Sequence, residues 1–317
     1  MHAKIRQKIS EYKSIIITSH VHPDGDAMGS VFGLAELIRT EFPGTSVHCT
    51  GELKASMIGR LAMDEVEAQT FSHALVIVID TANTPRIAEE RWESGAYIIK
   101  IDHHPLQDTF GDLVWVDTAY ASCCEMVADL MREWGGSTTK LGAELILHGI
   151  ITDTGRFRYP SVTSRTLLCA DKLLSYGVDL QTIYAELYTE SLEETRFRGF
   201  ILENFEIRKG LVAYMKFPSA IFQQMGDKPR AALRSVNLLS TIAGVATWVF
   251  FVEEEENIRV ELRSNGPAVN TVAARFGGGG HAKAAGARIE SWAIADEMIS
   301  DLYETSNRWK ESNSIVQ

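Results

Sequence analysis

The sequence has little cysteine and little proline, and it lacks a long apolar run. Four cysteines and eight prolines occur among 317 residues. Because no two cysteines have the CxxC spacing, a zinc or redox site built on paired thiols is excluded, and we expect reduced, mostly buried thiols. The longest purely apolar run, Ala74 to Ile79, is far too short to span a bilayer, so no membrane partner is expected.

The first residues show no sign of a secretion signal. Met1 to Lys13 is charged, and no apolar signal-peptide core follows it. Its apolar residues Ile5, Ile9 and Tyr12 recur at helical spacing, which predicts a helix. Together with the cysteine pattern, this segment predicts a cytoplasmic protein.

Positive charge is also in deficit. The chain has 31 lysines and arginines against 42 aspartates and glutamates, a formal net charge of −11. Proteins that bind long polyphosphate strands usually carry a basic surface, so long duplex nucleic acid is not expected as a partner. A nucleic-acid substrate should be short and held by a few local cations. Part of the negative excess could belong to a metal site.

The first half of the chain alternates apolar strands with helical patterns. Continuous apolar strands separated by helices predict a parallel sheet covered by helices on both faces. Ligands bind such sheets beyond the carboxyl ends of the strands. The predicted strands are Ser14 to Thr18, Leu75 to Ile79, Tyr97 to Ile101 and Leu113 to Val116, and the predicted helices are Ala27 to Arg39, Ser122 to Trp134, Gly142 to Ile151 and Ser164 to Ser175.

The second half predicts a smaller α/β domain with a mixed sheet. Strands are expected at Leu211 to Phe217, Ala246 to Val252 and Ile258 to Arg263, with a charged turn at Glu253 to Glu256. Before them, Glu190 to Asn204 reads as a charged helix. We therefore predict an N-terminal domain at residues 1–189, a connecting helix or linker at 190–205 and a C-terminal domain at 206–317.

Acidic residues and histidines gather at the predicted strand ends and loops. Taken singly, each has an ordinary explanation: Asp26 as a helix N-cap, Asp80 as a turn residue, and a lone histidine as a surface or core residue. Taken together they are unusual, because several carboxylates at one edge of a sheet cannot all stay ionised without cations. Mixed aspartate and histidine ligands favour manganese, iron, magnesium or zinc. The four segments are His20 to Ser30, Asp80, Asp102 to His104, and Asp153.

These four segments resemble the motifs of DHH-family phosphoesterases. They read HVHPDGDAMGS, Asp80 after a strand, Asp102-His103-His104, and Asp153 within ITDTG. Near the C-terminus, FGGGGHAKAAG resembles the GGGH signature of the DHH-associated domain. The resemblance spans almost the whole chain. The DTANTPRI segment from Asp80 is most similar to family members that act on both short oligoribonucleotides and 3′-phosphoadenosine 5′-phosphate (pAp).

The resemblance implies a site with two divalent metal ions, most readily Mn²⁺. One ion would be held by His20 and Asp24. Asp80 would bridge the two ions, and His104 and Asp102 would be the catalytic pair, with His104 beside the scissile phosphate and Asp102 orienting the histidines. His22 stands where many relatives have asparagine, and we interpret it as a loop residue. The ligands of the second ion would be Asp26, His103 and Asp153.

The resemblance also implies substrate contacts in the second domain. Four glycines expected to precede a helix could bring backbone amides close to a phosphate, with His281 and Lys283 nearby. Arg263 should project from the face opposite its buried strand neighbours, either to bind substrate or as a solvated strand end. Arg156 could hold a phosphate, although ordinary packing explains it equally well. The substrate-binding candidates are Arg156, Arg263, Ser264, Asn265, Gly278, Gly279, Gly280 and His281.

The expected activity is metal-dependent hydrolysis in a cleft between the two domains. The substrates would be short single-stranded RNA of about two to five nucleotides and pAp. The alternative is a stand-alone phosphodiesterase for cyclic di-AMP or its linear product pApA. A non-catalytic nucleotide-binding protein is disfavoured because binding alone does not call for two metals. Metal identity, cleavage polarity, the preference among these substrates, and the choice between monomer and homodimer stay open.

Overall fold

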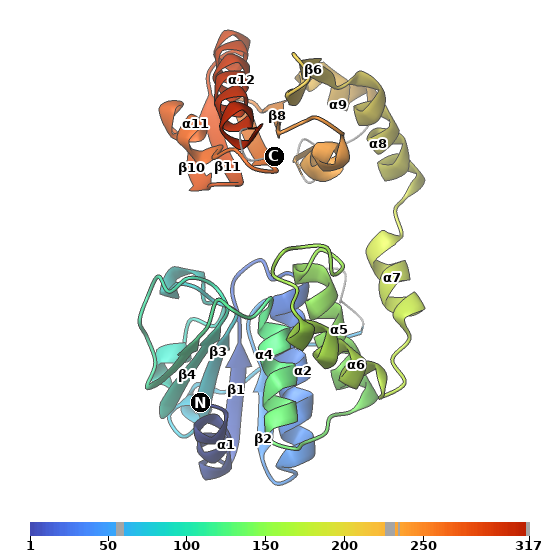
Figure 1. Cartoon of the computed structure of the whole chain (residues 1–317). Coiled ribbons are helices and arrows are strands. Elements are labelled where there is room, and N and C mark those ends of the chain that lie inside the picture. The colour runs from blue at the N-terminus through green and yellow to red at the C-terminus, as the bar shows by residue number, and fades with distance from the viewer. Residues whose placement is uncertain (55–59, 226–231, 234, 315–317) are drawn as a thin grey trace. The chain divides into compact units, whose positions relative to one another are not determined.

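The computed structural model describes residues 1–54, 60–225, 232–233 and 235–314 (Figure 1). The chain forms two compact units, Met1–Tyr188 and Thr189–Gln317. Each unit has its own sheet and its own hydrophobic core. Within the described residues, no helix combines the length and the apolar character needed to cross a membrane.

The sheet of the first unit is parallel throughout, which confirms the predicted fold class. Its order is β2-β1-β3-β4-β5. The four predicted strands are present, whereas β2 was missed because its short SVHC segment alternates polar and apolar residues. The strands are β1 (Ser14–Thr18), β2 (Ser46–Cys49), β3 (Leu75–Ile79), β4 (Tyr97–Asp102) and β5 (Leu113–Val116).

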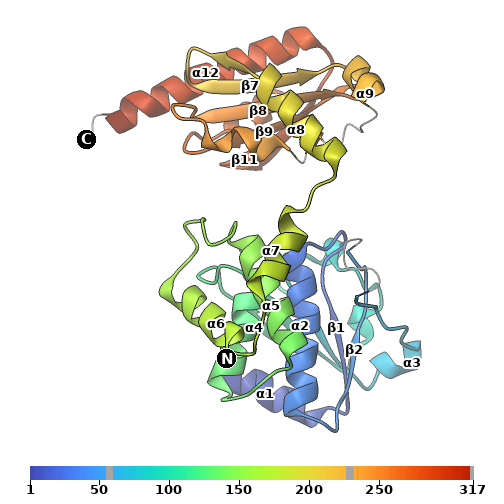
Figure 2. The same ribbon diagram turned by 90° about the vertical axis from the view of Figure 1, so that its right-hand side faces the viewer.

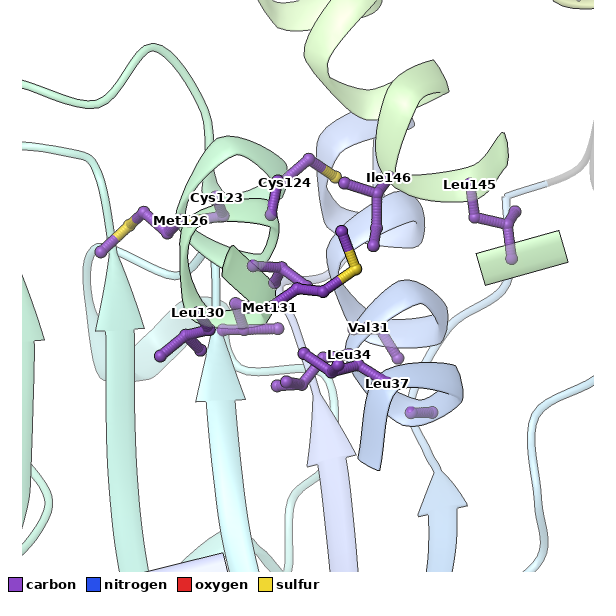
Figure 3. Close-up of a cluster of buried hydrophobic side chains, with 14 of the residues drawn as sticks. Val31, Leu34, Leu37, Cys123, Cys124, Met126, Leu130, Met131, Leu145 and Ile146 are labelled. Carbon is purple, nitrogen blue, oxygen red and sulfur yellow. The ribbon is translucent and has the colours of Figure 1, made fainter. Parts of the chain in front are cut away.

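Long helices cover one face of this sheet. These are α2 (Gly25–Glu41), α4 (Cys123–Glu133) and α5 (Lys140–Asp153) (Figure 2). Their apolar side chains gather in the main core (Figure 3). The other face is covered by shorter elements, α3 (Ala68–Phe71) and the 3₁₀ turns η2 (Thr84–Arg86) and η3 (Trp92–Ser94). The remaining helices of the unit are α1 (His2–Glu11), α6 (Ser164–Leu174) and α7 (Leu180–Tyr188).

Two glycines of α2 allow α5 to approach it closely. A Cβ atom at Gly25 would lie 2.5 Å from Thr152 Oγ1, and one at Gly29 would lie 2.5 Å from the carbonyl oxygen of Leu145. Both distances are shorter than van der Waals contact allows, so a larger side chain would push the helices apart. This close packing fixes the last turn of α5, which ends at Asp153.

The second unit contains a mixed sheet, as predicted, but it has six strands where three were expected, in the order β10-β11-β9-β8-β7-β6. β7 and β8 are parallel and the other neighbours are antiparallel. α12 packs against one face, and α8 with η4 packs against the other. The elements are α8 (Leu192–Asn204), β6 (Glu206–Arg208), β7 (Val212–Phe217), α9 (Ser219–Met225), η4 (Val236–Thr241), β8 (Thr247–Glu253), β9 (Ile258–Ser264), α11 (Asn270–Arg275), β10 (Gly279–His281), β11 (Ala284–Ile289) and α12 (Trp292–Ser314).

Two local predictions are wrong. The glycine run does not precede a helix: it follows α11, and Gly279–His281 forms β10, the first strand of a hairpin with β11. Gly280 has a φ of 133°, a conformation that glycine adopts and larger residues rarely do. Asp153, which was expected in a loop, is the last residue of α5. In both places, a short polar or glycine-rich segment was assigned to the wrong kind of element.

Candidate metal centre

The sheet topology brings three sets of acidic residues and histidines together. β1, β3 and β4 are parallel neighbours, so their carboxyl ends lie along one edge. His20 lies two residues beyond β1, Asp80 directly follows β3, and Asp102 is the last residue of β4. The predicted convergence of these strand ends is therefore present in the structure.

Asp80 is the central side chain of this edge. It is only 2% exposed, and its backbone has a φ of 57°, in the left-handed region that non-glycine residues seldom occupy. Its amide donates a hydrogen bond to the carbonyl oxygen of Ile101 on the neighbouring strand. Asp80 belongs to three groups whose donor atoms all lie within 4.8 Å of one another: Asp26, Asp80, His103 and Cys123; His20, Asp24 and Asp80; and Asp80, Asp102 and His104.

His20 and Asp24 form one side of the cluster. His20 Nε2 lies 3.7 Å from Asp80 Oδ2, while its Nδ1 lies 2.9 Å from the carbonyl oxygen of Val21. A hydrogen on Nδ1 directed at that carbonyl leaves the Nε2 lone pair free for a cation. Asp24, and not Asp26, is the N-cap of α2: its Oδ1 accepts hydrogen bonds from the amides of Asp26 and Ala27.

His103 faces the other side of the cluster. Its Nε2 lies 3.7 Å from Asp80 Oδ1, 3.9 Å from Asp26 Oδ2 and 3.4 Å from Asp153 Oδ2. The two oxygens of Asp26 accept hydrogen bonds of 2.7 and 2.8 Å from the amides of Cys123 and Cys124 at the start of α4. The N-terminus of α4 thereby orients the Asp26 carboxylate and stabilises its negative charge.

Burial and mutual repulsion disfavour charge on these carboxyl groups. Burial, followed by repulsion from Asp26 and Asp24, raises the pKa of Asp80 well above its ordinary value. Burial likewise raises the pKa of Asp26 and raises that of Asp153 to about 8. Burial lowers the pKa of His103, so its neutral ring is favoured. Positive charge supplied from outside the protein would relieve the repulsion.

The donor set fits divalent metal ions. Asp80 Oδ1 is buried and has no hydrogen-bond partner among the described residues, as expected of a ligand atom. Carboxylate oxygens and neutral imidazoles suit manganese, magnesium, iron and zinc. Cys123 is close to the cluster, but burial raises the pKa of its thiol well above the ordinary value. A neutral thiol is a weak ligand, so the ligands proposed here are aspartates and histidines.

His104 and Asp102 form a hydrogen-bonded pair beside the cluster. Asp102 Oδ1 lies 2.9 Å from His104 Nδ1 and accepts a hydrogen bond of 3.1 Å from the His104 amide. The Asp102 side chain is fully buried, whereas that of His104 is 42% exposed. This hydrogen bond raises the pKa of His104. His104 Nδ1 also lies 3.5 Å from Asp80 Oδ1, so the pair adjoins the shared carboxylate.

The predicted substrate contacts are divided between the two units. Arg156 has a φ of 65°, and its guanidinium lies over the ring of Tyr188, 4.2 Å from the centroid. His22 is an exposed loop residue whose ring lies 3.5 Å from Glu52. The other candidates belong to the second unit, where they surround the β10-β11 hairpin: Arg263, Ser264, Asn265, Gly278, Gly279, Gly280 and His281.

Several residues that support the site were missed in the sequence. The adjacent amides of Cys123 and Cys124 hold Asp26, and the helical pattern after Ser122 could have indicated a helix N-terminus there. Lys100 is fully buried within β4, and a lysine in a strand otherwise composed of apolar residues was the signal for it.

Comparison with known proteins matches the two units to one family. Residues 14–150 match the N-terminal domain of the DHH family, and residues 211–311 match the DHHA1 domain. The chain is 40% identical to the bifunctional oligoribonuclease and PAP phosphatase NrnA of Bacillus subtilis, over 95% of this chain and 97% of that protein. The chain belongs to the DHH family. The resemblance inferred from the five motifs is thereby confirmed.

Two further similar proteins are less similar in sequence. A crystal structure of an exopolyphosphatase-related protein from Bacteroides fragilis has a TM-score of 0.85 and 26% identity, and it covers 98% of this chain and 97% of that one. The cyclic-di-AMP phosphodiesterase GdpP of Geobacillus thermodenitrificans is 26% identical, and the match covers 95% of this chain but only 49% of GdpP. NrnA is more similar to this chain in sequence than either of these proteins, and it is more similar in length than GdpP.

Proposed function

We propose that this protein is a metal-dependent phosphoesterase that hydrolyses short oligoribonucleotides to mononucleotides and dephosphorylates pAp to AMP. The observation that carries the proposal is Asp80, a buried carboxylate shared by three groups of potential metal ligands. Identity of 40% to a bifunctional oligoribonuclease and PAP phosphatase over nearly the full length of both chains supports the choice of substrates. The free, buried cysteines suit a cytoplasmic location.

The residues of the cluster would hold two divalent ions, which we propose to be Mn²⁺. His20 and Asp24 would bind one ion, and Asp80 would be shared. Such a pair of ions supplies Lewis acidity, which neutralises a phosphate and makes water nucleophilic near neutral pH. Burial of His20 and Asp80 keeps these two ligands fixed, whereas Asp24 is exposed. The remaining ligands, for the second ion, would be Asp26, His103 and Asp153.

His104 would act on the scissile phosphate. Its ring borders Asp80 but its side chain is 42% exposed, so a substrate can reach the ring. The Asp102 carboxylate fixes the ring through Nδ1 and favours the protonated imidazole. A proton on Nε2 can then stabilise the developing negative charge or pass to the leaving oxygen.

The C-terminal unit would bind the part of the substrate away from the scissile bond. Arg263 lies across from Ala284 on β11, next to the glycine hairpin, with its Nη1 3.1 Å from Glu261 Oε2. His281 is exposed on β10. The Ser264 hydroxyl is already engaged with the backbone of its own loop, so we expect it to shape that loop.

Short substrates agree with the charge of the protein. Each phosphate that extends beyond the local cations adds repulsion from a chain whose net charge is −11. A nucleotide such as pAp or a few linked nucleotides avoids this cost. Activity is therefore proposed to be highest for about two to five nucleotides.

The test is a panel of pAp, pApA, cyclic di-AMP and RNAs of about two to twenty nucleotides, assayed with manganese after removal of bound metal. The proposal expects AMP from pAp and mononucleotides from the shortest RNAs, with Asp80→Ala inactive on both. Cleavage of cyclic di-AMP or pApA without activity on pAp or other dinucleotides would instead support the alternative phosphodiesterase. Absence of hydrolysis of every substrate would refute the proposed function.

A further inference from the structure

Lys100 is an unusual residue in the first sheet. It lies in the interior of β4, between Ile99 and Ile101, and its side chain is completely buried. Moving an ammonium group from water into a protein interior costs free energy unless the group finds polar partners. An apolar residue would fit this strand at no such cost. The partners of Lys100 therefore indicate why a charge is present.

Two of these partners are backbone carbonyl groups. Lys100 Nζ donates hydrogen bonds to the carbonyl oxygens of Ala82, at 2.9 Å, and Asp108, at 3.0 Å. Ala82 lies two residues after Asp80, and Asp108 lies in the loop that begins with His103. One ammonium group thus connects the two loops that leave the candidate metal centre.

The third partner is the carboxylate of Asp102. Lys100 Nζ lies 3.9 Å from Asp102 Oδ2, an oxygen that is buried and has no hydrogen-bond partner among the described residues. The other oxygen, Oδ1, is occupied by the amide and Nδ1 of His104. Lys100, Asp102 and His104 therefore form a chain of contacts that leads from the interior of the sheet to the exposed ring of His104.

We propose that Lys100 is a positioning residue, which fixes the carboxylate of Asp102 and, through it, the imidazole of His104. The ammonium attracts Oδ2 and so turns Oδ1 toward His104, while its two backbone bonds hold the loops on either side. This inference rests on the proposed function, in which His104 acts on the scissile phosphate. Lys100 itself touches no substrate.

A double-variant cycle tests whether Lys100 acts through Asp102. Lys100→Met removes the charge and keeps most of the side-chain volume, and Lys100→Gln keeps hydrogen-bond donors for the loop carbonyls if the methionine variant does not fold. Either variant should lower kcat for pAp about 10- to 100-fold with KM nearly unchanged, as replacing a partner of a reacting side chain typically does. In an Asp102→Asn background, the same change should cost less than about threefold.

Thr84→Val is the matched control. It removes a hydrogen bond from the Thr84 hydroxyl to Asp108 Oδ2, between the same two loops, but leaves Lys100 and Asp102 intact. Its kcat should stay near that of the unaltered protein. Unchanged kcat in both Lys100 variants would overturn the inference. The inference would also be overturned if the fold losses of kcat from the Lys100 and Asp102 changes multiplied in the double variant. A loss of kcat in Thr84→Val as large as that in Lys100→Met would overturn it too.

A spectroscopic measurement separates this inference from the proposed function. In the metal-free protein, the ¹⁵N resonance of His104 Nδ1 reports its hydrogen bond to Asp102. Lys100→Met and Lys100→Gln should shift this resonance toward that of a solvent-exposed histidine, whereas Thr84→Val should not. An unshifted resonance would refute the positioning role, even in an active enzyme. A shifted resonance in a protein that hydrolyses none of the substrates would support the positioning of His104 and refute the proposed function.

Discussion

Replacing Asp153 with asparagine should stabilise the metal-free protein. Asp153 Oδ2 lies 3.4 Å from His103 Nε2, and the side chain is 30% exposed. Burial, and then the charges of Asp26 and Asp24, raise its pKa to about 8, although His104 partly opposes the shift. An aspartate in an unfolded chain has a pKa of about 3.9. The folded protein therefore holds a proton on this group more tightly than the unfolded chain does.

The sign and size of the effect follow from this difference. The stabilising contribution of the protonated Asp153 carboxyl group is fully present below pH ~4. It is lost as the pH rises toward 8, because the unfolded chain releases this proton first. At pH 7 the solution is about three pH units above the pKa of the unfolded carboxyl group. At 1.36 kcal/mol per unit, the free energy of unfolding has fallen by at most about 4 kcal/mol. Partial exposure and relaxation reduce this, and we expect Asp153→Asn to raise the free energy of unfolding by about 2 kcal/mol.

Urea unfolding of chelator-treated protein at pH 4.5 and pH 7.5 measures the effect. In thermal unfolding of the same samples, about 2 kcal/mol corresponds, for a unit of this size, to a rise in Tm of roughly 4–8 °C. The gain should be much smaller at pH 4.5, where the carboxyl group is protonated in the folded state. Manganese should stabilise the unaltered protein more than the variant, because the variant lacks a proposed ligand. A variant that is less stable at pH 7.5 without metal would refute the electrostatic reasoning.

Three further predictions concern catalysis and binding. His104→Ala should lower kcat while the bound metal is retained, which steady-state kinetics and metal analysis of the same sample would show; loss of the metal would make His104 a ligand. His281→Ala should raise KM for pAp more than it lowers kcat, and the opposite pattern would mean that the two histidines have exchanged roles. The kcat/KM for RNA should be highest at about two to five nucleotides and fall sharply by roughly twenty. Equal values for a dinucleotide and a long strand would contradict the short-substrate proposal.

Regular patterns made most of the N-terminal fold predictable. Strand β3 is a continuous apolar run, and β1 and β4 are mostly apolar, with Lys100 interrupting β4. The chemistry at their carboxyl ends follows from parallel topology. β2 was missed because four residues with alternating polarity give a weak signal. The glycine run was assigned to the start of a helix because glycine permits several conformations, and only its pairing with β11 decides among them.

The candidate site was partly predictable for the same reason. The proximity of His20, Asp80 and Asp102 could be predicted, because these residues lie at the ends of neighbouring strands. The support of Asp26 by the amides of Cys123 and Cys124 depends on contacts between residues almost a hundred positions apart, which one sequence does not reveal. The contacts of Lys100 span only 18 and 8 positions, but its two hydrogen-bond partners are backbone carbonyl groups of loops, which carry no sequence signal.

The central claim is that Asp80 joins two metal ions in one site. The direct measurement is the manganese content per chain, determined by mass spectrometry after loading and removal of free metal, for the unaltered protein and for Asp80→Ala. The account predicts two ions per chain in the unaltered protein and loss of most of the metal in the variant, with the fold retained by circular dichroism. A single ion in the unaltered protein, or full manganese content in Asp80→Ala, would contradict it.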